Sequence, residues 1–182
     1  MKDKENNTYT VLFVCSGNSC RSPMAEGLLK KKLFTKYGTK VTIQSAGTLG
    51  INGNPATLHA ITAAREKGVD ISNHVSRGVN DQIISNADIV FTMADHHKEF
   101  LDRYYPKYKE NFFLLKAFNL KGKKSKNLSI KDPIGEGLKT YRQVISQIDE
   151  ELERILPRLE LLINKNIASQ IEDAPFFESI DS

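Results

Sequence analysis

The sequence predicts an α/β fold: a single three-layer domain with a central four-stranded parallel sheet and helices on both faces. Two observations predict it. Short runs of β-branched and aromatic residues alternate along the chain with segments whose apolar residues recur at helical spacing. Glycine and proline separate these segments. Such alternation is typical of parallel sheets with right-handed crossovers, whose ligand sites lie at the carboxyl ends of the strands.

The first half of the chain supplies two strands and two helices. Residues 11–14 (Val-Leu-Phe-Val) form an apolar run short enough for a buried strand, and a helical pattern follows it to Tyr37. Residues 41–44 alternate apolar and polar side chains, as a strand does. A second helix is expected from about Pro55 to Lys67, with the proline in its first turn.

The second half supplies the other two strands. Residues 87–93 predict the third strand, and a helix follows it to Tyr105, where the next residue is a proline. Residues 112–115 predict the fourth strand. The final helix begins at about Leu138 and carries apolar residues on one face, which should cover the sheet; Pro157 is expected to kink or shorten it.

The length and composition of the chain indicate its domain organisation. The chain has 182 residues, of which 40% are hydrophobic and 26% charged, as is typical of one globular domain. We expect the folded domain over residues 9–163, a short tail over residues 1–8 and a flexible C-terminal tail over residues 164–182. Residues 121–126 (Lys-Gly-Lys-Lys-Ser-Lys) predict a solvated cationic loop.

The charge and the distribution of apolar residues indicate the cellular location and the kinds of partner to expect. No apolar stretch reaches the roughly 20 residues of a membrane helix, and the polar segment Met1 to Asn7 lacks the apolar core of a secretion signal. We therefore expect a cytoplasmic protein with no membrane contact. The net charge of +4 suits acidic or phosphorylated partners as well as nucleic acid. Because the aromatic-and-basic motifs of nucleic-acid readers are missing, we expect no nucleic-acid partner.

The segment Cys15 to Pro23 (Cys-Ser-Gly-Asn-Ser-Cys-Arg-Ser-Pro) lies between the first strand and the first helix. Gly17 and Asn18 permit the positive φ of a tight turn, and Pro23 suits the first position of the helix. The backbone N–H groups of such a loop, together with the helix N-terminus, suit a dianion such as phosphate.

Three side chains of this loop suit phosphoryl chemistry. The helix N-terminus and the adjacent arginine favour the thiolate of Cys15, which is the reactive form of cysteine. Arg21 presents a forked guanidinium that binds two phosphoryl oxygens in parallel. Outside this setting, Cys15 would be interpreted as a buried strand-end cysteine and Arg21 as a helix-start cation. Ser22 suits either donation to the Cys15 sulfur or the N-cap of the helix.

The loop resembles the signature Cys-x-Gly-Asn-x-Cys-Arg-Ser-Pro of the low-molecular-weight protein tyrosine phosphatases and the related bacterial protein-arginine phosphatases. The similarity covers roughly residues 8–160. It implies a phosphate-binding loop after the first strand and a cysteine-dependent protein phosphatase that acts on phosphorylated proteins through a phosphocysteine intermediate. Other matching segments are Met24-Ala25-Glu26-Gly27, Ser45-Ala46-Gly47, Ile71-Ser72-Asn73-His74, Ala87-Asp88-Ile89-Val90 and Lys131-Asp132-Pro133.

The resemblance also implies a role for each site residue. Cys15 matches the nucleophile, Arg21 the phosphate clamp, and Asp132, in the chain's single Asp-Pro dipeptide, the general acid. Cys20 matches a family cysteine that forms a reversible disulfide with the nucleophile, which implies redox sensitivity. Asn18 and His74 match residues that hydrogen-bond to each other. The residues expected to bind phosphate or to support the loop are Ser16, Gly17, Asn18, Ser19, Cys20, Ser22 and His74.

We expect no metal and no cofactor, because His59, His96 and His97 lack metal-ligand spacing with cysteine or carboxylate side chains. The adjacent His96 and His97 should face different directions on a helix. Two alternatives are a thiol-dependent arsenate reductase and a non-catalytic phosphoprotein-binding module. The reductases relay oxidation through further cysteines, whereas this chain has only Cys15 and Cys20. We expect a monomer or a weak dimer.

The substrate amino acid depends on Ser19. Tyrosine-directed relatives carry a bulky aliphatic residue at this position and aromatic residues after the Asp-Pro, where this chain has Ile134 and Gly135. Arginine-directed relatives carry a threonine at the loop position. Ser19 keeps the hydroxyl and lacks the methyl group, so the sequence favours phosphoarginine slightly over phosphotyrosine.

Overall fold

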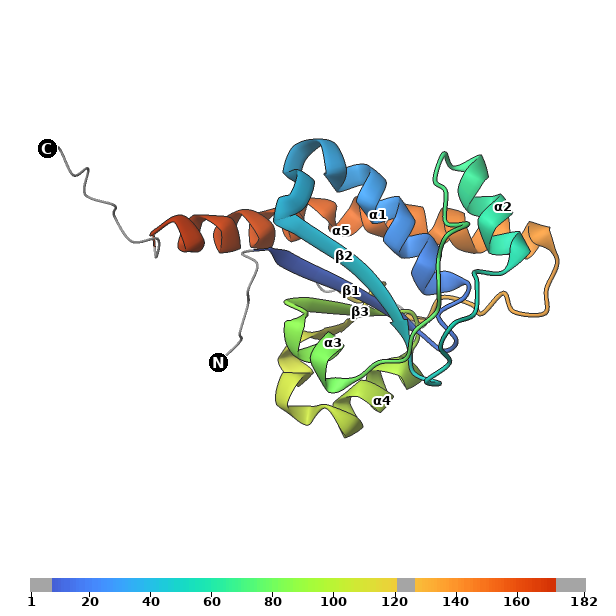
Figure 1. The fold of residues 1–182 in the computed structure, drawn as a ribbon, viewed down its shortest axis with the longest axis horizontal. Helices are drawn as coiled ribbons and strands as arrows, with labels where there is room; N and C mark the ends of the chain where they lie inside the picture. Colours follow the sequence, from blue (N-terminus) through green and yellow to red (C-terminus); the bar gives the residue numbers. More distant parts are fainter. Residues whose placement is uncertain (1–7, 121–126, 173–182) are drawn as a thin grey trace, which may run out of the picture.

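The computed structural model describes residues 8–120 and 127–172, so predictions that concern residues 1–7, 121–126 and 173–182 lie outside the described residues. Four strands form one parallel sheet in the order β2-β1-β3-β4 (Figure 1). This confirms the predicted parallel sheet. The strands are β1 (Tyr9–Cys15), β2 (Val41–Gly47), β3 (Ile89–Thr92) and β4 (Phe112–Leu114).

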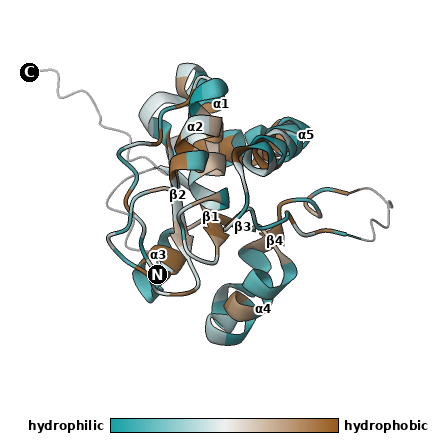
Figure 2. Cartoon of the chain, turned by 90° about the vertical axis from the view of Figure 1, so that its right-hand side faces the viewer, coloured by the Kyte–Doolittle hydropathy of each residue, from teal (hydrophilic) through white to brown (hydrophobic). Residues whose placement is uncertain are grey.

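Helices lie on both faces of the sheet, which confirms the three layers (Figure 1). Figure 2 shows the same arrangement from the end of the molecule, with α4 on the opposite side of the strands from α1, α2 and α5. Over the described residues, no helix has an apolar stretch that would span a bilayer. The helices are α1 (Arg21–Tyr37), α2 (Leu58–Glu66), α3 (Asp81–Asn86), α4 (Asp95–Tyr104) and α5 (Leu138–Glu172).

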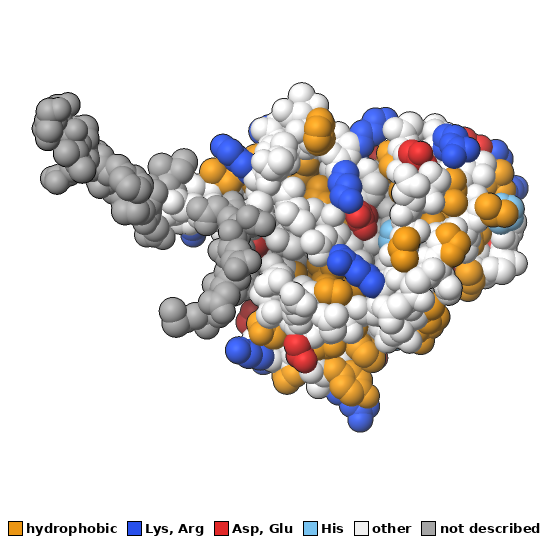
Figure 3. All heavy atoms as spheres, in the orientation of Figure 1, with side chains coloured by type: hydrophobic (Ala, Val, Ile, Leu, Met, Phe, Trp, Pro, Cys, Tyr) orange, Lys and Arg blue, Asp and Glu red, His pale blue; other side chains and the backbone are white. Residues whose placement is uncertain are grey.

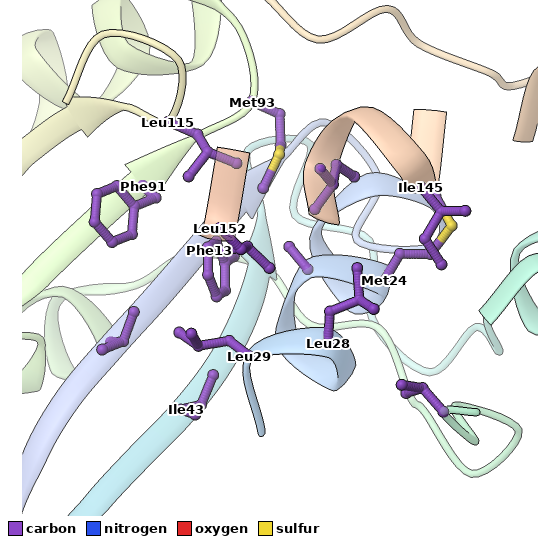
Figure 4. Close-up of a cluster of buried hydrophobic side chains, with 14 of the residues drawn as sticks. Phe13, Met24, Leu28, Leu29, Ile43, Phe91, Met93, Leu115, Ile145 and Leu152 are labelled. Carbon is purple, nitrogen blue, oxygen red and sulfur yellow. The ribbon is translucent and has the colours of Figure 1, made fainter. Parts of the chain in front are cut away.

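β1 lies inside the sheet, and its side chains enter both hydrophobic layers. Val11 and Phe13 belong to the layer beneath α1 and α5, where Phe13 lies near Leu152 (Figure 4). Leu12 and Val14 belong to the layer on the other face. Each such buried side chain stabilises the fold by about 1.5–3 kcal/mol. Packing on both faces therefore fixes the carboxyl end of β1, where the loop of interest begins.

The second helix begins later than predicted. α2 starts at Leu58, because the Thr57 hydroxyl accepts a hydrogen bond from the Ala60 N–H (3.3 Å) and caps the helix. Pro55 pairs instead with Val75 in an isolated antiparallel bridge, so it is not in the first turn. α3 has no counterpart in the sequence predictions, because its six residues are too few to show helical periodicity.

The last helix is longer than predicted. Pro157 lies inside α5 without ending it, and the helix continues to Glu172. Ile163 is fully buried and Ile167 packs against the core, so the apolar face extends beyond the expected end of the domain. Residues 164–172 are therefore helical, in contrast to the flexible tail that was expected to begin at residue 164.

Candidate active site

The loop between β1 and α1 makes its tight turn at one residue. Asn18 adopts a φ of 54°, in the left-handed region, whereas Gly17 does not. α1 begins at Arg21, so Pro23 is the third helical residue and not the first. A proline is tolerated there because the N–H groups of the first turn have no partner within the helix.

The backbone of this loop offers unpaired donors. Within residues 8–120 and 127–172, no protein group accepts a hydrogen bond from the N–H groups of residues 17–20. These groups precede the N-terminus of α1, whose macrodipole adds partial positive charge. A loop with such donors at a helix N-terminus suits phosphate.

Cys15 ends β1 at the base of this loop and is 2% exposed. Its Sγ lies 3.0 Å from Ser22 Oγ, and Asn18 Nδ2 donates to that same oxygen (3.0 Å). Because Ser22 accepts from Asn18, its hydroxyl proton is available to the Cys15 sulfur. Ser22 is the second residue of α1 and does not cap it. Of the two roles expected for Ser22, the geometry therefore fits the contact with the sulfur.

Asn18 is fully buried and joins the loop to its surroundings. Its Nδ2 also donates to Ser45 Oγ (2.8 Å), and its Oδ1 accepts from the Arg77 N–H (3.0 Å). The expected contact with His74 is present, but it is made to the Asn18 carbonyl oxygen, 2.7 Å from His74 Nε2. Since each of these polar atoms is paired, the loop is held in one conformation.

Gly47, the last residue of β2, lies against the loop backbone. A Cβ there would be 2.5 Å from the Ser16 carbonyl oxygen, 3.0 Å from the Asn18 nitrogen and 3.1 Å from the Gly17 carbonyl carbon. Because these are backbone atoms, we expect Gly47→Ala to lower the free energy of unfolding by about 1–3 kcal/mol and to lower catalytic activity. Urea unfolding and kcat/KM would measure both effects. Gly137→Ala is the matched control, since a Cβ at Gly137 meets nothing within 4 Å; equal behaviour of the two variants would contradict the prediction.

Arg21 and Asp132 meet, although 111 residues separate them. The Arg21 side chain is 3% exposed and its Nη2 forms an ion pair with Asp132 Oδ2, whose side chain is 38% exposed. Arg21 Nη2 also donates to Ser16 Oγ (3.3 Å), and Nη1 donates to the Ile130 carbonyl oxygen (3.2 Å). The structure thus places the candidate phosphate clamp beside the candidate acid.

The segment that carries Asp132 is tied to the sheet and to α4. The Ile130 N–H donates to the Met93 carbonyl oxygen (2.7 Å), and Ser129 Oγ donates to Asp95 Oδ2 (2.8 Å). Ile130 is buried, 1% exposed. Asp132 Oδ1 itself accepts a hydrogen bond from the N–H of residue 134 (3.1 Å). These contacts fix the backbone from which the Asp132 carboxylate reaches Arg21.

Ser19 and Cys20 lie against hydroxyl groups that the sequence patterns did not identify. Cys20 Sγ is 3.5 Å from Thr57 Oγ1 and 3.4 Å from Tyr141 Oη. Burial, and then the contact with Cys20, raise the pKa of Tyr141 to about 12, so this phenol is neutral. The Ser19 carbonyl oxygen accepts from the Thr57 N–H (2.9 Å). Both cysteines, Cys15 and Cys20, are free thiols.

His97 is a further residue that the sequence patterns did not place at the site. It is fully buried, and its Nε2 lies 2.8 Å from Ser16 Oγ. His96 is exposed whereas His97 is buried, as expected of neighbours that face different directions on a helix, although their ring centroids are 4.0 Å apart. Among the described residues, no group of three His, Cys, Asp or Glu side chains is arranged to hold a metal ion.

Comparison of the sequence and of the whole structure with known proteins identifies a family. The model of the low molecular weight phosphotyrosine protein phosphatase family matches residues 10–168. A protein-arginine-phosphatase of Bacillus subtilis is 33% identical over 150 residues, which are 82% of this chain and 96% of that protein. The crystal structure of a low molecular weight protein tyrosine phosphatase from T. tengcongensis has a TM-score of 0.74 and 32% identity, and the match covers 83% of this chain and 99% of the other.

An arsenate reductase of Staphylococcus epidermidis is also similar, but over a smaller part of both chains. It is 46% identical over 85 residues, which are 47% of this chain and 59% of that protein. The family model, in contrast, matches from within β1 into α5 and so includes the loop, Asp132 and their supporting contacts. This chain belongs to the low molecular weight phosphotyrosine protein phosphatase family.

Proposed function

We propose that this phosphoprotein phosphatase works through a phosphocysteine on Cys15, with Arg21 as the phosphate clamp and Asp132 as general acid and then general base. One observation carries the proposal. The fold brings the Arg21 guanidinium to the Asp132 carboxylate across 111 residues, at a loop whose buried cysteine sulfur lies 3.0 Å from a hydroxyl. A nucleophile, a forked cation and an acid at one anion-binding loop are the parts that covalent phosphoryl transfer requires.

In the first step, the Cys15 thiolate attacks phosphorus and the bond to the leaving group breaks. The Arg21 fork and the loop N–H groups stabilise the charge on the phosphoryl oxygens. The departing tyrosine oxygen or arginine nitrogen takes a proton from Asp132. A bound phosphoryl group would compete with this carboxylate for Arg21, which would free the Asp132 side chain to face the leaving group.

In the second step, water attacks the phosphorus of the phosphocysteine. Asp132, now a carboxylate, takes a proton from the water, and Cys15 leaves as a thiolate. Ser22 Oγ, 3.0 Å from the sulfur, donates a hydrogen bond to this leaving group. The products are inorganic phosphate and the dephosphorylated protein, and the enzyme returns to its starting state.

Three exposed apolar side chains belong to, or lie within two residues of, residues that contact the loop or Arg21, and they suit a protein substrate. Leu49, Leu58 and Ile134 are 65%, 80% and 59% exposed, respectively. Leu49 is held at the loop by its N–H, which donates to the Ser16 carbonyl oxygen (3.0 Å). Figure 3 shows hydrophobic side chains at the surface of the end of the molecule that carries α2. Contacts of this kind would hold the residues that flank a phosphorylated side chain.

Between the two substrate amino acids, we favour phosphoarginine. Ser19 Oγ and Thr57 Oγ1 lie 3.7 Å and 3.5 Å from Cys20 Sγ, so hydroxyl groups line this side of the loop. The N–H groups of a phosphorylated guanidinium need acceptors that a phenyl ring does not need. Ile134 offers an aliphatic and not an aromatic contact. The similarity to the Bacillus subtilis protein-arginine-phosphatase supports this preference.

The test is kcat/KM on matched phosphoarginine and phosphotyrosine peptides, without added metal and with Cys15→Ser as the blank. We expect a preference for phosphoarginine, which Ser19→Thr should preserve. Ser19→Ile should shift the preference toward phosphotyrosine by roughly 10-fold, because isoleucine adds apolar surface for a phenyl ring and removes the hydroxyl. A preference for phosphotyrosine in the wild type would contradict the choice of substrate. Activity no higher than that of the blank on either peptide would contradict the proposed function.

We also propose that the enzyme acts in the cytoplasm on phosphorylated proteins, as a monomer or a weak dimer, and not on nucleic acid. Its chemistry supports the location, because a reducing compartment keeps Cys15 and Cys20 in the free thiol form that the site requires. Gel filtration under reducing conditions would test the oligomeric state.

A further inference from the structure

A buried histidine outside the signature segment contacts the loop. His97 lies in the first turn of α4 and is 0% exposed, and its Nε2 is 2.8 Å from Ser16 Oγ. Ser16 Oγ also accepts a hydrogen bond from Arg21 Nη2 (3.3 Å). The Ser16 hydroxyl therefore links His97 to the phosphate clamp.

The surroundings of His97 determine its protonation. Burial, the charge of Arg21 and the neighbouring His96 lower the pKa of His97 to about 3, so the ring is neutral. A neutral imidazole carries one N–H. The Nδ1 atom is buried and has no hydrogen-bond partner among the described residues. Because a buried N–H without a partner is rarer than an acceptor without one, the proton belongs on Nε2.

This assignment gives the direction of the hydrogen bonds at Ser16. The Ser16 oxygen accepts from His97 Nε2 (2.8 Å) and from Arg21 Nη2 (3.3 Å), so both of its lone pairs are used. Its own proton is then left for a third group. Ser16 follows Cys15 directly and is partly exposed in the anion-binding loop. The acceptor that suits this proton is an oxygen of the phosphoryl group.

We propose that His97 is a positioning residue, which holds the Ser16 hydroxyl so that its oxygen supports Arg21 and its proton is donated to a phosphoryl oxygen of the substrate. The inference rests on the proposed phosphoryl transfer at Cys15. It explains how Arg21 keeps its orientation when Asp132 changes its protonation during the reaction. The contacts of Arg21 with Ser16 Oγ and with the Ile130 carbonyl oxygen do not involve the Asp132 carboxylate.

Enzyme kinetics with single and double variants test this role. We expect His97→Leu and Ser16→Ala each to lower kcat/KM by roughly 10- to 100-fold, the effect of losing one charge-assisted contact at a precisely oriented site. The kcat/KM of the double variant should be no lower than that of the less active single variant, because both changes remove the same hydrogen bond between His97 and Ser16. His97→Gln retains an amide N–H in place of Nε2 and should recover most of the loss. Glu99→Gln, at an exposed residue of the same helix, is the matched control and should leave kcat/KM unchanged.

The inhibition constant for inorganic phosphate separates positioning from a general loss of structure. It should rise in Ser16→Ala and in His97→Leu but not in His97→Gln, while urea unfolding reports the stability of each variant. If His97→Leu does not fold, Ser16→Ala and His97→Gln decide the outcome on their own. Additive losses in the double variant, or full activity in Ser16→Ala, would overturn the proposal.

Nitrogen-15 NMR of histidine-labelled protein tests the tautomer and needs no activity. We expect a protonated Nε2 and an unprotonated Nδ1 for His97 near neutral pH. A proton on Nδ1 would overturn the proposal, because the Ser16 proton would then be donated to His97 and not to a substrate. A wild-type enzyme without phosphatase activity would contradict the proposed function instead, and the NMR result would still decide the tautomer.

Discussion

Arg21→Lys is expected to lower kcat/KM by roughly 10³- to 10⁵-fold, the range by which a catalytic arginine accelerates phosphoryl transfer. Lysine keeps the positive charge but has no planar fork. It therefore cannot contact the Ile130 carbonyl oxygen and Ser16 Oγ and still bind two phosphoryl oxygens. Steady-state kinetics with a phosphopeptide should show a lower kcat as well as a higher KM, because the proposed clamp would bind the phosphoryl group most strongly in the transition state.

The matched control for this variant is Arg154→Lys. Arg154 on α5 also donates to backbone carbonyl oxygens, those of Phe118 (2.7 Å) and Leu115 (3.0 Å), but it is not part of the catalytic loop. Arg154→Lys should lower stability and leave kcat/KM unchanged. A kcat/KM of Arg21→Lys close to the wild-type value would contradict the role of Arg21 as the phosphate clamp.

Asp132→Asn is expected to lower kcat by roughly 10²- to 10⁴-fold on phosphotyrosine peptides, the usual contribution of a general acid. Asparagine has nearly the same shape and can still accept a hydrogen bond from Arg21, but it has no acidic proton to donate. The phenol of tyrosine has a pKa of about 10, so its oxygen is a poor leaving group without that proton. We therefore expect the decrease in kcat to come from the missing proton transfer and not from a loss of folded protein.

The leaving group distinguishes this role from a structural one. In an aryl phosphate whose phenol is much more acidic than that of tyrosine, the phenolate departs readily without a proton. On that substrate, Asp132→Asn should therefore lower the rate of phosphocysteine formation far less. Glu136→Gln is the matched control: Glu136 is exposed, pairs with Lys131 (3.0 Å) and should be dispensable. Equal losses on both substrates would contradict the assignment of Asp132 as the acid.

The sheet and the loop could be predicted because their signals are local in the sequence. The apolar run before Cys15 is buried on both faces of the sheet, and a central parallel strand has this pattern. The segment from Cys15 to Pro23 matches a signature as a whole, and the structure places it at the carboxyl end of β1. Asp132 could be found because it stands in a distinctive dipeptide.

Apart from His74, whose match to the family indicated its contact with Asn18, the residues that support the loop from other elements could not be predicted, because their signals are not local. Ser45 and Arg77 reach Asn18 from 27 and 59 residues away. Ser45 lies in a segment that matches the family, but neither that match nor any periodicity indicates a contact with Asn18. Tyr141 reaches Cys20 across 121 residues from the buried face of α5, where the pattern shows only that it is apolar. His97 could not be placed at the site either, because its partner Ser16 is 81 residues away in the sequence and no motif links the two.

The end of the domain was misjudged for a different reason. A proline in a helical pattern usually marks an end or a kink, and the polar residues after Ile163 resemble a tail. In the structure, Pro157 stays within the helix, and the packing of Ile163 and Ile167 extends it. Tertiary contacts therefore overrode the local preference of the sequence.

The most direct test of the catalytic role of Cys15 is to locate the phosphoryl group during turnover. The enzyme would be mixed with a phosphopeptide, quenched rapidly, digested and mapped by mass spectrometry, with Cys15→Ala as the control. We predict a phosphoryl group on Cys15 that forms and decays at rates compatible with kcat, and none in the control. Turnover with no phosphoryl group on the enzyme, or with one on any other residue, would contradict covalent catalysis by Cys15.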